Sequence, residues 1–153
     1  MARVFLENVT KKTGALCPIF DFTLEVKDKE FTTFLGPSGS GKTTLLRLVA
    51  GLERQDSGHI YIGDSVVDDV SPADRDTAMV FQTYALYPHL NVYKNLASPL
   101  EARNTPKDEI DSSVKEVADI LQISHLLNKM PIHLSGGEMQ RVAIGRATIR
   151  RPK

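Results

Sequence analysis

The sequence predicts an α/β fold in which strands come first and helices follow, and three observations support this prediction. Segments near the N-terminus alternate apolar and polar residues, as half-buried strands do. A glycine-rich loop stands between an expected strand and an expected helix. From about residue 90 onwards, apolar residues recur at helical spacing. We therefore expect one domain with a β-rich base and a helical lobe.

Five segments have the pattern of strands. The first two alternate well enough to pair with each other, and the later ones are short. The predicted strands are residues 3–9, 19–26, 29–36, 59–64 and 77–82. A polar, Asp-rich connection lies between the last two.

Two helices are predicted with specific ends. One follows Gly41 and stops at Gly51, which stands where a C-terminal glycine cap belongs. The other follows Thr105, with Pro106 at its start and apolar residues at helical spacing from Ile110 onwards. We expect Thr105 to cap this helix through its side chain.

Composition excludes several classes of protein. The chain has 153 residues, of which 41% are hydrophobic and 25% charged, as in an ordinary globular domain. Its 19 basic and 19 acidic residues cancel, so net charge gives no general attraction to nucleic acid or anionic lipid. The single cysteine, Cys17, excludes an intrachain disulfide and suits a reducing cytosol. No window approaches the roughly 18 apolar residues of a membrane span.

The stretch GPSGSGKTT contains the pattern G-x-x-x-x-G-K-[ST], placed between a strand and a helix. Glycines let successive backbone N–H groups point at one anion, and the helix behind them adds its positive dipole end. A lysine then contacts the β- and γ-phosphates, and a threonine hydroxyl ligates Mg²⁺. A glycine-rich turn with a solvated lysine is the alternative. The predicted nucleotide-binding residues are Gly36, Pro37, Ser38, Gly39, Ser40, Gly41, Lys42, Thr43 and Thr44.

A second motif begins at Ser135, which is followed three residues later by Glu138 and then by a helical run. This spacing is typical of a capping box. Gly136 and Gly137 lie inside it, although each glycine costs a helix about 1 kcal/mol relative to alanine. Their presence indicates that something approaches this helix start closely, and a phosphate is the natural candidate. An ordinary capped helix with a loose start is the alternative.

With these motifs, the chain resembles the ATP-binding subunit of ATP-binding cassette (ABC) transporters along essentially all of its length. LSGGEMQR at 134–141 looks like the family's signature motif, GPSGSGKTT at 36–44 like its Walker A loop and MVFQ at 79–82 like its Q-loop. The stretches at 84–96, 51–53 and 72–76 look most like those of importers of sugars and related solutes.

The resemblance implies a P-loop NTPase core with an N-terminal antiparallel β subdomain and a helical subdomain. It implies a single partial ABC ATPase domain over residues 1–153. Within it, residues 1–90 would form the β subdomain and phosphate-loop core. Residues 91–140 would form the helical subdomain with the signature motif, and 141–153 the start of a truncated core.

The resemblance also implies roles for individual residues. Lys42 would bind the β- and γ-phosphates of ATP, Thr43 would ligate Mg²⁺, and Gln82 would reach the metal and the attacking water. Ser135, Gly136, Gly137 and Glu138 would complete the ATP site of a second ATPase subunit in a head-to-tail dimer. For Gln82 taken alone, a capped strand end is the alternative.

The partners that the resemblance implies are the second ATPase subunit and integral membrane permease subunits, at the cytoplasmic face of the cell membrane. The stretch from Tyr84 to Tyr93 would help to form the groove for a permease helix. Aromatic side chains that fill a seam between the lobes are the alternative. No nucleic-acid partner is expected.

Two departures from the family pattern modify these expectations. The family usually has an aromatic residue that stacks on adenine where this chain has Thr13, and Phe20 could substitute for it. In the family, an Asp and a Glu needed for hydrolysis follow the position of Lys153. We therefore expect the 153 residues alone to be weakly stable, and to bind ATP without hydrolysing it.

Two other functions stay open from the sequence. The first is a non-transport ABC ATPase acting on nucleic acid or ribosomes, because residues 141–153 contain five basic residues and no acidic one. The second is a noncatalytic nucleotide-binding module that competes for dimer partners.

Overall fold

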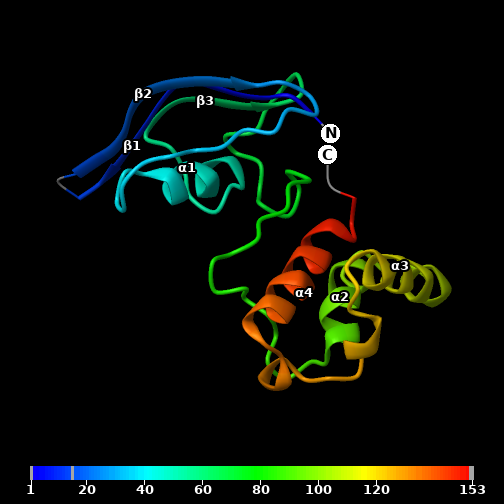
Figure 1. Cartoon of the computed structure of the whole chain (residues 1–153). Coiled ribbons are helices and arrows are strands. Elements are labelled where there is room, and N and C mark those ends of the chain that lie inside the picture. Colours follow the sequence, from blue (N-terminus) through cyan, green and yellow to red (C-terminus); the bar gives the residue numbers. More distant parts are fainter. Residues whose placement is uncertain (1, 15, 152–153) are drawn as a thin grey trace. The chain divides into compact units, whose positions relative to one another are not determined.

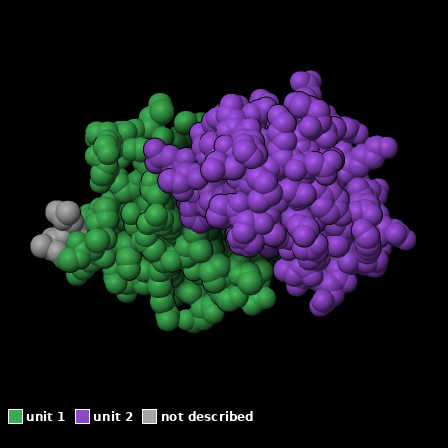
Figure 2. Space-filling view, turned by 90° about the horizontal axis from the view of Figure 1, so that it is seen from below, with its two compact units in different colours: residues 1–77, 153 green, residues 78–152 purple. Residues whose placement is uncertain are grey.

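The computed structural model describes residues 2–14 and 16–151. Their contacts group them into two compact units, the first ending at Thr77 and the second beginning at Ala78 (Figure 2). The boundary expected from the sequence at residue 90 lies inside the second unit. None of the helices in the described ranges is both long and apolar enough to cross a membrane.

The first unit is built on an antiparallel sheet of four strands in the order β2-β1-β3-β4 (Figure 1). The strands are β1 (Val4–Thr13), β2 (Leu16–Val26), β3 (Ser57–Ile62) and β4 (Ser65–Val66). The predicted pairing of the first two strands is confirmed, with Val4 opposite Val26. β2 contains Pro18, which the sheet tolerates because β2 is an edge strand.

A bulge in β1 decides which of its residues face the core. Asn8 has a φ of 49°, and the register with β2 shifts between Leu6 and Val9. As a result, Leu6 and Val9 are both buried although they are three residues apart. Gly58 on β3 faces the bulge, and a Cβ on it would lie 2.4 Å from the carbonyl oxygen of Asn8.

Helix α1 (Lys42–Val49) packs against one face of this sheet (Figure 1). Leu45 and Leu48 from the helix join Leu6, Val9 and Ile60 from the strands in one buried core. The predicted helix end is confirmed: Gly51 has a φ of 75°, and its N–H donates to the carbonyl oxygen of Leu48.

Two predicted strands, 29–36 and 77–82, are wrong for this structure. Neither segment takes part in the sheet of the described residues, and both lack regular structure over most of their length. A strand is stable only beside a neighbour that satisfies its backbone groups, and apolar composition does not supply that neighbour. Phe31 and Leu35 are accordingly 93% and 91% exposed.

The second unit is helical, as predicted from residue 90 onwards (Figure 1). Its elements are α2 (Val92–Glu101), α3 (Lys107–Ile120), the 3₁₀ turns Ser124–Leu126 and Pro131–His133, and α4 (Gly136–Thr148). The three helices share one buried core, which includes Leu96, Val114 and Val142. Gly145 lets α4 approach α2, because a Cβ there would lie 2.7 Å from a methyl group of Leu96.

The predicted cap of α3 is a further correction. Pro106 occupies the N-cap position and no side chain caps the helix, so Thr105 lies one residue too early. Asp108 and Glu109 stand in the first turn, where their negative charge complements the helix dipole. This electrostatic contribution takes the place of the expected hydroxyl cap.

Candidate functional site

The glycine-rich loop takes the backbone conformation that its sequence requires. Gly39 and Gly41 have φ values of 82° and 87°, a region that side chains other than glycine rarely adopt. Gly41 also meets β2 closely, since a Cβ there would lie 2.7 Å from the carbonyl oxygen of Pro18. Glycine is thus required at position 41 both by conformation and by space.

The ammonium group of Lys42 lies within the curl of this loop. Its Nζ donates to the carbonyl oxygens of Gly36 and Pro37 at 2.8 and 2.6 Å, and to Oγ of Ser40 at 3.2 Å. Three contacts from one side chain close the loop on itself and place a full positive charge inside it. Lys42 is half-buried, whereas Gly36 to Ser40 are exposed.

The start of α1 adds to this positive potential. Gly41 is its N-cap, and no side chain accepts from the N–H groups of the first turn. Its first turn contains no acidic residue. Helix N-termini with such N–H groups bind anions. Thr43 lies exposed in that first turn, next to Lys42.

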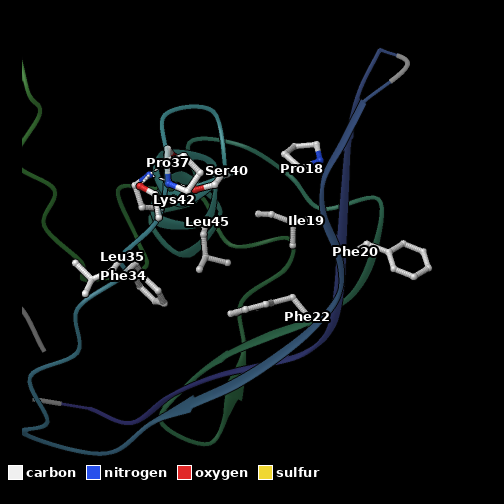
Figure 3. A pocket seen from close by; sticks show the side chains of 12 residues that line it. Pro18, Ile19, Phe20, Phe22, Phe34, Leu35, Pro37, Ser40, Lys42 and Leu45 are labelled. Carbon is white, nitrogen blue, oxygen red and sulfur yellow. Dashed lines mark hydrogen bonds between the residues drawn. The ribbon is translucent and has the colours of Figure 1, made fainter.

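A pocket of about 430 Å³ lies between this loop and β2 (Figure 3). Its lining combines apolar side chains with the loop itself: Pro18, Ile19, Phe20, Phe22, Phe34, Leu35, Gly36, Pro37, Ser40, Gly41, Lys42 and Leu45. Ile19 and Phe22 point toward the side on which the loop lies. The loop and β2 together can receive a ligand with an anionic part and an apolar part.

The second motif forms the predicted capping box at the start of α4, in the other unit. Oγ of Ser135 accepts from the N–H of Glu138 at 3.3 Å, and Oε2 of Glu138 accepts from the N–H of Ser135 at 2.7 Å. The Ser135 hydroxyl donates to the same carboxylate oxygen at 2.8 Å. The backbone hydrogen bond from Ser135, followed by that from its hydroxyl, lowers the pKa of Glu138.

The glycines inside this box are not required by packing within the unit. A Cβ on Gly137 would meet no heavy atom of the described chain within 4 Å other than those of its chain neighbours and of the α4 backbone. A Cβ on Gly136 would lie 3.5 Å from the hydroxyl oxygen of Tyr84, an ordinary contact. The helix start is therefore open to a ligand or a second chain.

Comparison with known proteins decides the family. A family model described as "ABC transporter" matches residues 19–153. The chain belongs to the ABC transporter family.

Curated ABC relatives match along the whole chain. It is 54% identical to the trehalose/maltose import ATP-binding protein MalK of Thermococcus litoralis, and 55% identical to the sn-glycerol-3-phosphate import ATP-binding protein UgpC of Rhodopseudomonas palustris. It is 50% identical to the maltose/maltodextrin import ATP-binding protein MalK of Vibrio vulnificus. These matches cover 100% of the chain but only 41–43% of each relative, so the chain spans less than half of their length.

Solved structures confirm the fold class. The dimeric post-hydrolysis structure of the ATP-binding cassette MJ0796, bound to ADP and Pi, matches with a TM-score of 0.87 and 32% identity. A second dimeric structure of MJ0796 matches with the same TM-score. Each match covers 97% of this chain and 70% of the other, so this chain has part of the ABC ATPase fold.

The remaining predicted ABC residues lie at two places. Gln82 is exposed, at a turn near the start of the second unit. Thr13 is exposed at the end of β1. The ring of Phe20 projects from the opposite side of β2 to the phosphate loop and is 77% exposed (Figure 3). Phe20 also belongs to the lining of the pocket beside the loop, so its substitution for an adenine-stacking residue at position 13 stays a prediction.

The structure also shows residues of this ABC domain that sequence reasoning missed. Arg75 is buried against the end of α1, and Asn95 is fully buried beneath the turn that follows Tyr87. Arg146 lies over the ring of Tyr87. Asn95 had a detectable signal, because it stands among apolar residues at helical spacing, and a polar residue on such a face needs buried partners.

Proposed function

We propose that this chain provides the ATP-binding part of the energy-coupling subunit of an ABC importer for a sugar or related solute. The observation that supports this most directly is the closed phosphate loop with Lys42 inside it, at the start of an uncapped helix. The relatives that match along the whole chain carry names of import ATP-binding proteins for trehalose, maltose and sn-glycerol-3-phosphate. The solute class is inferred from those names.

ATP binding in this proposal uses the loop of residues 36–44. The N–H groups at the start of α1 contact the phosphates, and Lys42 exchanges its bonds to Gly36 and Pro37 for bonds to the β- and γ-phosphates. This exchange preserves the hydrogen bonding of the ammonium group. It also keeps the positive charge of Lys42 next to the bound phosphates.

Mg²⁺ would be held by Thr43 together with the phosphates. Mg²⁺ in phosphate sites is bound by few protein groups and keeps several waters, and the exposed hydroxyl of Thr43 in the first turn of α1 fits this pattern. We assign to Gln82 the positioning of the metal and of the attacking water. Its exposed place at a turn leaves the amide accessible.

A second copy would complete each site. Ser135, Gly136, Gly137 and Glu138 would meet the nucleotide of the partner, in a head-to-tail dimer. Beyond its chain neighbours and the backbone of α4, no atom of the described chain lies within 4 Å of a Cβ on Gly137. This supports the proposal, because a close approach from outside is what the missing side chain permits. Dimerisation would then depend on ATP.

The permease subunits would contact the stretch from Tyr84 to Tyr93, at the cytoplasmic face of the membrane. Tyr87 in this stretch is an aromatic residue that is 46% exposed, as expected for a contact residue. The side chain of Tyr93 is instead held by a hydrogen bond, which its hydroxyl donates to Asp111. This bond raises the pKa of Tyr93 to about 12.

For the 153 residues alone, we propose binding without hydrolysis. None of the described residues that line the pocket beside the loop is an Asp or Glu. Positioning and electrostatics supply almost all of the catalysis in phosphoryl transfer. The described lining of this pocket therefore supplies no carboxylate that could accept a proton from the attacking water.

The test is ATP binding by the purified wild-type protein and by a Lys42→Ala variant, measured by isothermal titration calorimetry with MgATP. Lys42→Ala is expected to remove most of the binding, a loss of about 100-fold or more. The matched control is Lys115→Ala, which removes a lysine exposed on α3. Unchanged affinity in Lys42→Ala would refute the phosphate-loop assignment.

A further inference from the structure

Arg146, near the C-terminal end of α4, contacts a segment that lies 59 to 62 residues earlier in the chain. Its guanidinium carbon is 4.9 Å from the centroid of the Tyr87 ring. Its Nη2 donates to the carbonyl oxygen of Tyr84 at 3.4 Å. One side chain thereby binds both ends of the segment Tyr84–Tyr87, which we call the docking segment.

The docking segment is anchored on its other side by Asn95 of α2. Oδ1 of Asn95 accepts from the N–H of Tyr87 at 2.8 Å, and Nδ2 donates to the carbonyl oxygens of Tyr87, Leu90 and Asn91. Asn95 is 0% exposed, so these bonds are sheltered from water. The backbone of Tyr87 is therefore fixed, while its ring remains available to Arg146.

The docking segment also meets the opposite end of α4. Tyr84 has a φ of 61°, and its hydroxyl oxygen lies 3.5 Å from the position of a Cβ on Gly136. Gly136 is the first residue of α4. The segment consequently meets α4 at both ends, at the glycine pair and at Arg146.

A helix of this length moves as one body, because every turn is hydrogen-bonded to the next. A displacement of Ser135–Gly137 therefore also displaces Arg146, and Arg146 in turn displaces Tyr87. The contact of Arg146 with the ring is an attraction between a cation and an aromatic face, so it resists separation of the docking segment from α4 during a small movement.

We propose that Arg146 is a positioning residue that makes the docking segment move with α4 when the capping-box residues meet a nucleotide. The proposal rests on the proposed function, in which Ser135–Gly137 contact ATP and Tyr84–Tyr93 contact the permease. Arg146 touches neither nucleotide nor permease in this scheme. It connects the two surfaces.

The competing explanation is that Arg146 only fills the seam between α4 and the docking segment. In that case a methionine, which has a similar length and no charge, serves equally well once stability is accounted for. If the cation is needed, lysine restores part of the effect and methionine does not. The Lys and Met variants therefore separate positioning from packing.

The experiment is hydrogen exchange measured by mass spectrometry on the purified protein, with and without MgATP. Two peptides are followed, one covering residues 134–141 and one covering residues 84–91. The proteins are wild type, Arg146→Met, Arg146→Lys and the control Lys115→Met. The unfolding temperature of each is measured alongside.

MgATP is expected to slow exchange in residues 134–141 in all four proteins. In residues 84–91 it should slow exchange by about threefold or more in wild type and Lys115→Met, less in Arg146→Lys and not at all in Arg146→Met. Equal slowing of residues 84–91 in Arg146→Met and wild type would overturn the proposal. So would loss of protection there in Arg146→Met before MgATP is added.

The experiment distinguishes failure of the proposed function from failure of the coupling through Arg146. If MgATP leaves residues 134–141 unchanged in wild type, the proposed role of the capping-box residues fails, and the coupling through Arg146 falls with it. If residues 134–141 respond but residues 84–91 do not, the proposed function stands and the coupling through Arg146 is refuted.

Discussion

A methyl group on Gly51 would lie 2.5 Å from Nε of Arg75, so these two residues fit each other only because one of them is glycine. The guanidinium of Arg75 donates to the carbonyl oxygens of Leu48 and Val49 at the end of α1, and to that of Val70. Arg75 is 4% exposed. It thus caps the helix that begins at the phosphate loop and ties it to the connection after β4.

Gly51→Ala is expected to destabilise the protein by about 2–4 kcal/mol. Roughly 1–2 kcal/mol of this comes from the left-handed backbone, and the rest from displacing Arg75. Gly63→Ala is the matched control, because Gly63 has a φ of 62° but a Cβ there would meet no described atom within 4 Å beyond its chain neighbours. Urea unfolding of both variants gives their free energies of unfolding, and the difference between the two losses measures the cost of displacing Arg75. Equal losses of unfolding free energy in Gly51→Ala and Gly63→Ala would show that the Arg75 side chain moves aside without a cost in stability.

Gly137→Ala should separate stability from dimerisation. Alanine in a helix is favoured over glycine by up to about 1 kcal/mol, and the structure leaves room for the methyl group. If the residue meets a partner's nucleotide, ATP-driven dimerisation falls by about tenfold or more while the unfolding temperature stays equal or rises. Sedimentation with MgATP measures the dimer, with Thr148→Ala at the other end of α4 as control. If Gly137→Ala dimerises with MgATP as well as wild type does, Gly137 does not lie at the dimer interface.

Thr13 should leave the adenine ring unstacked, so that ATP and GTP bind with similar affinity. A base stacked on an aromatic side chain gains about 1–3 kcal/mol. Thr13→Tyr is therefore expected to tighten ATP binding by about fivefold or more, whereas Thr13→Ser should have little effect. Calorimetric titration of each of the three proteins with MgATP and MgGTP gives the six affinities needed. A strong preference of wild type for ATP would contradict this prediction.

The His59–Asp68 pair on the sheet should make stability depend on pH. Nδ1 of His59 is 2.7 Å from Oδ2 of Asp68, and this hydrogen bond, followed by the charge of Asp68, raises the pKa of His59 above 6.5. Burial raises the pKa of Asp68, but hydrogen bonds from His59, the N–H of Ile60 and Gln55 outweigh it and lower that pKa.

The sign of this effect follows from linkage. Because the folded state holds the His59 proton more tightly, the stabilisation is complete below about pH 6.5 and is lost as pH rises through the raised pKa of His59. Proton NMR titration of the His59 ring should give a midpoint above 6.5 in wild type, and a lower one in Asp68→Asn. The same midpoint in both proteins would show that Asp68 does not cause the raised pKa of His59.

Local pattern predicted the parts of the fold that depend on local chemistry. The pairing of β1 and β2 follows from alternation, and the end of α1 at Gly51 from the conformational freedom of glycine. Segments 29–36 and 77–82 have the composition of strands but no partner strand in the described structure. Because strand formation depends on that partner, composition alone predicted them wrongly.

The parts of the site differ in the same way in how far they depend on local sequence. The phosphate loop could be predicted, since its residues are contiguous and each has a defined backbone task. Arg75 contacts Leu48, 27 residues away, and Arg146 contacts Tyr84, 62 residues away. No spacing rule relates such residues, so these contacts became visible only in the folded chain.

The exposed apolar stretch at residues 31–35 has a consequence for the behaviour of the protein in solution. Phe31 and Leu35 stand in extended chain outside the sheet of the described residues. Extended apolar segments of this kind are templates for pairing between molecules, which leads to aggregation. A sample of these 153 residues should therefore scatter light increasingly with concentration, and replacing Phe31 and Leu35 by lysine should delay that onset.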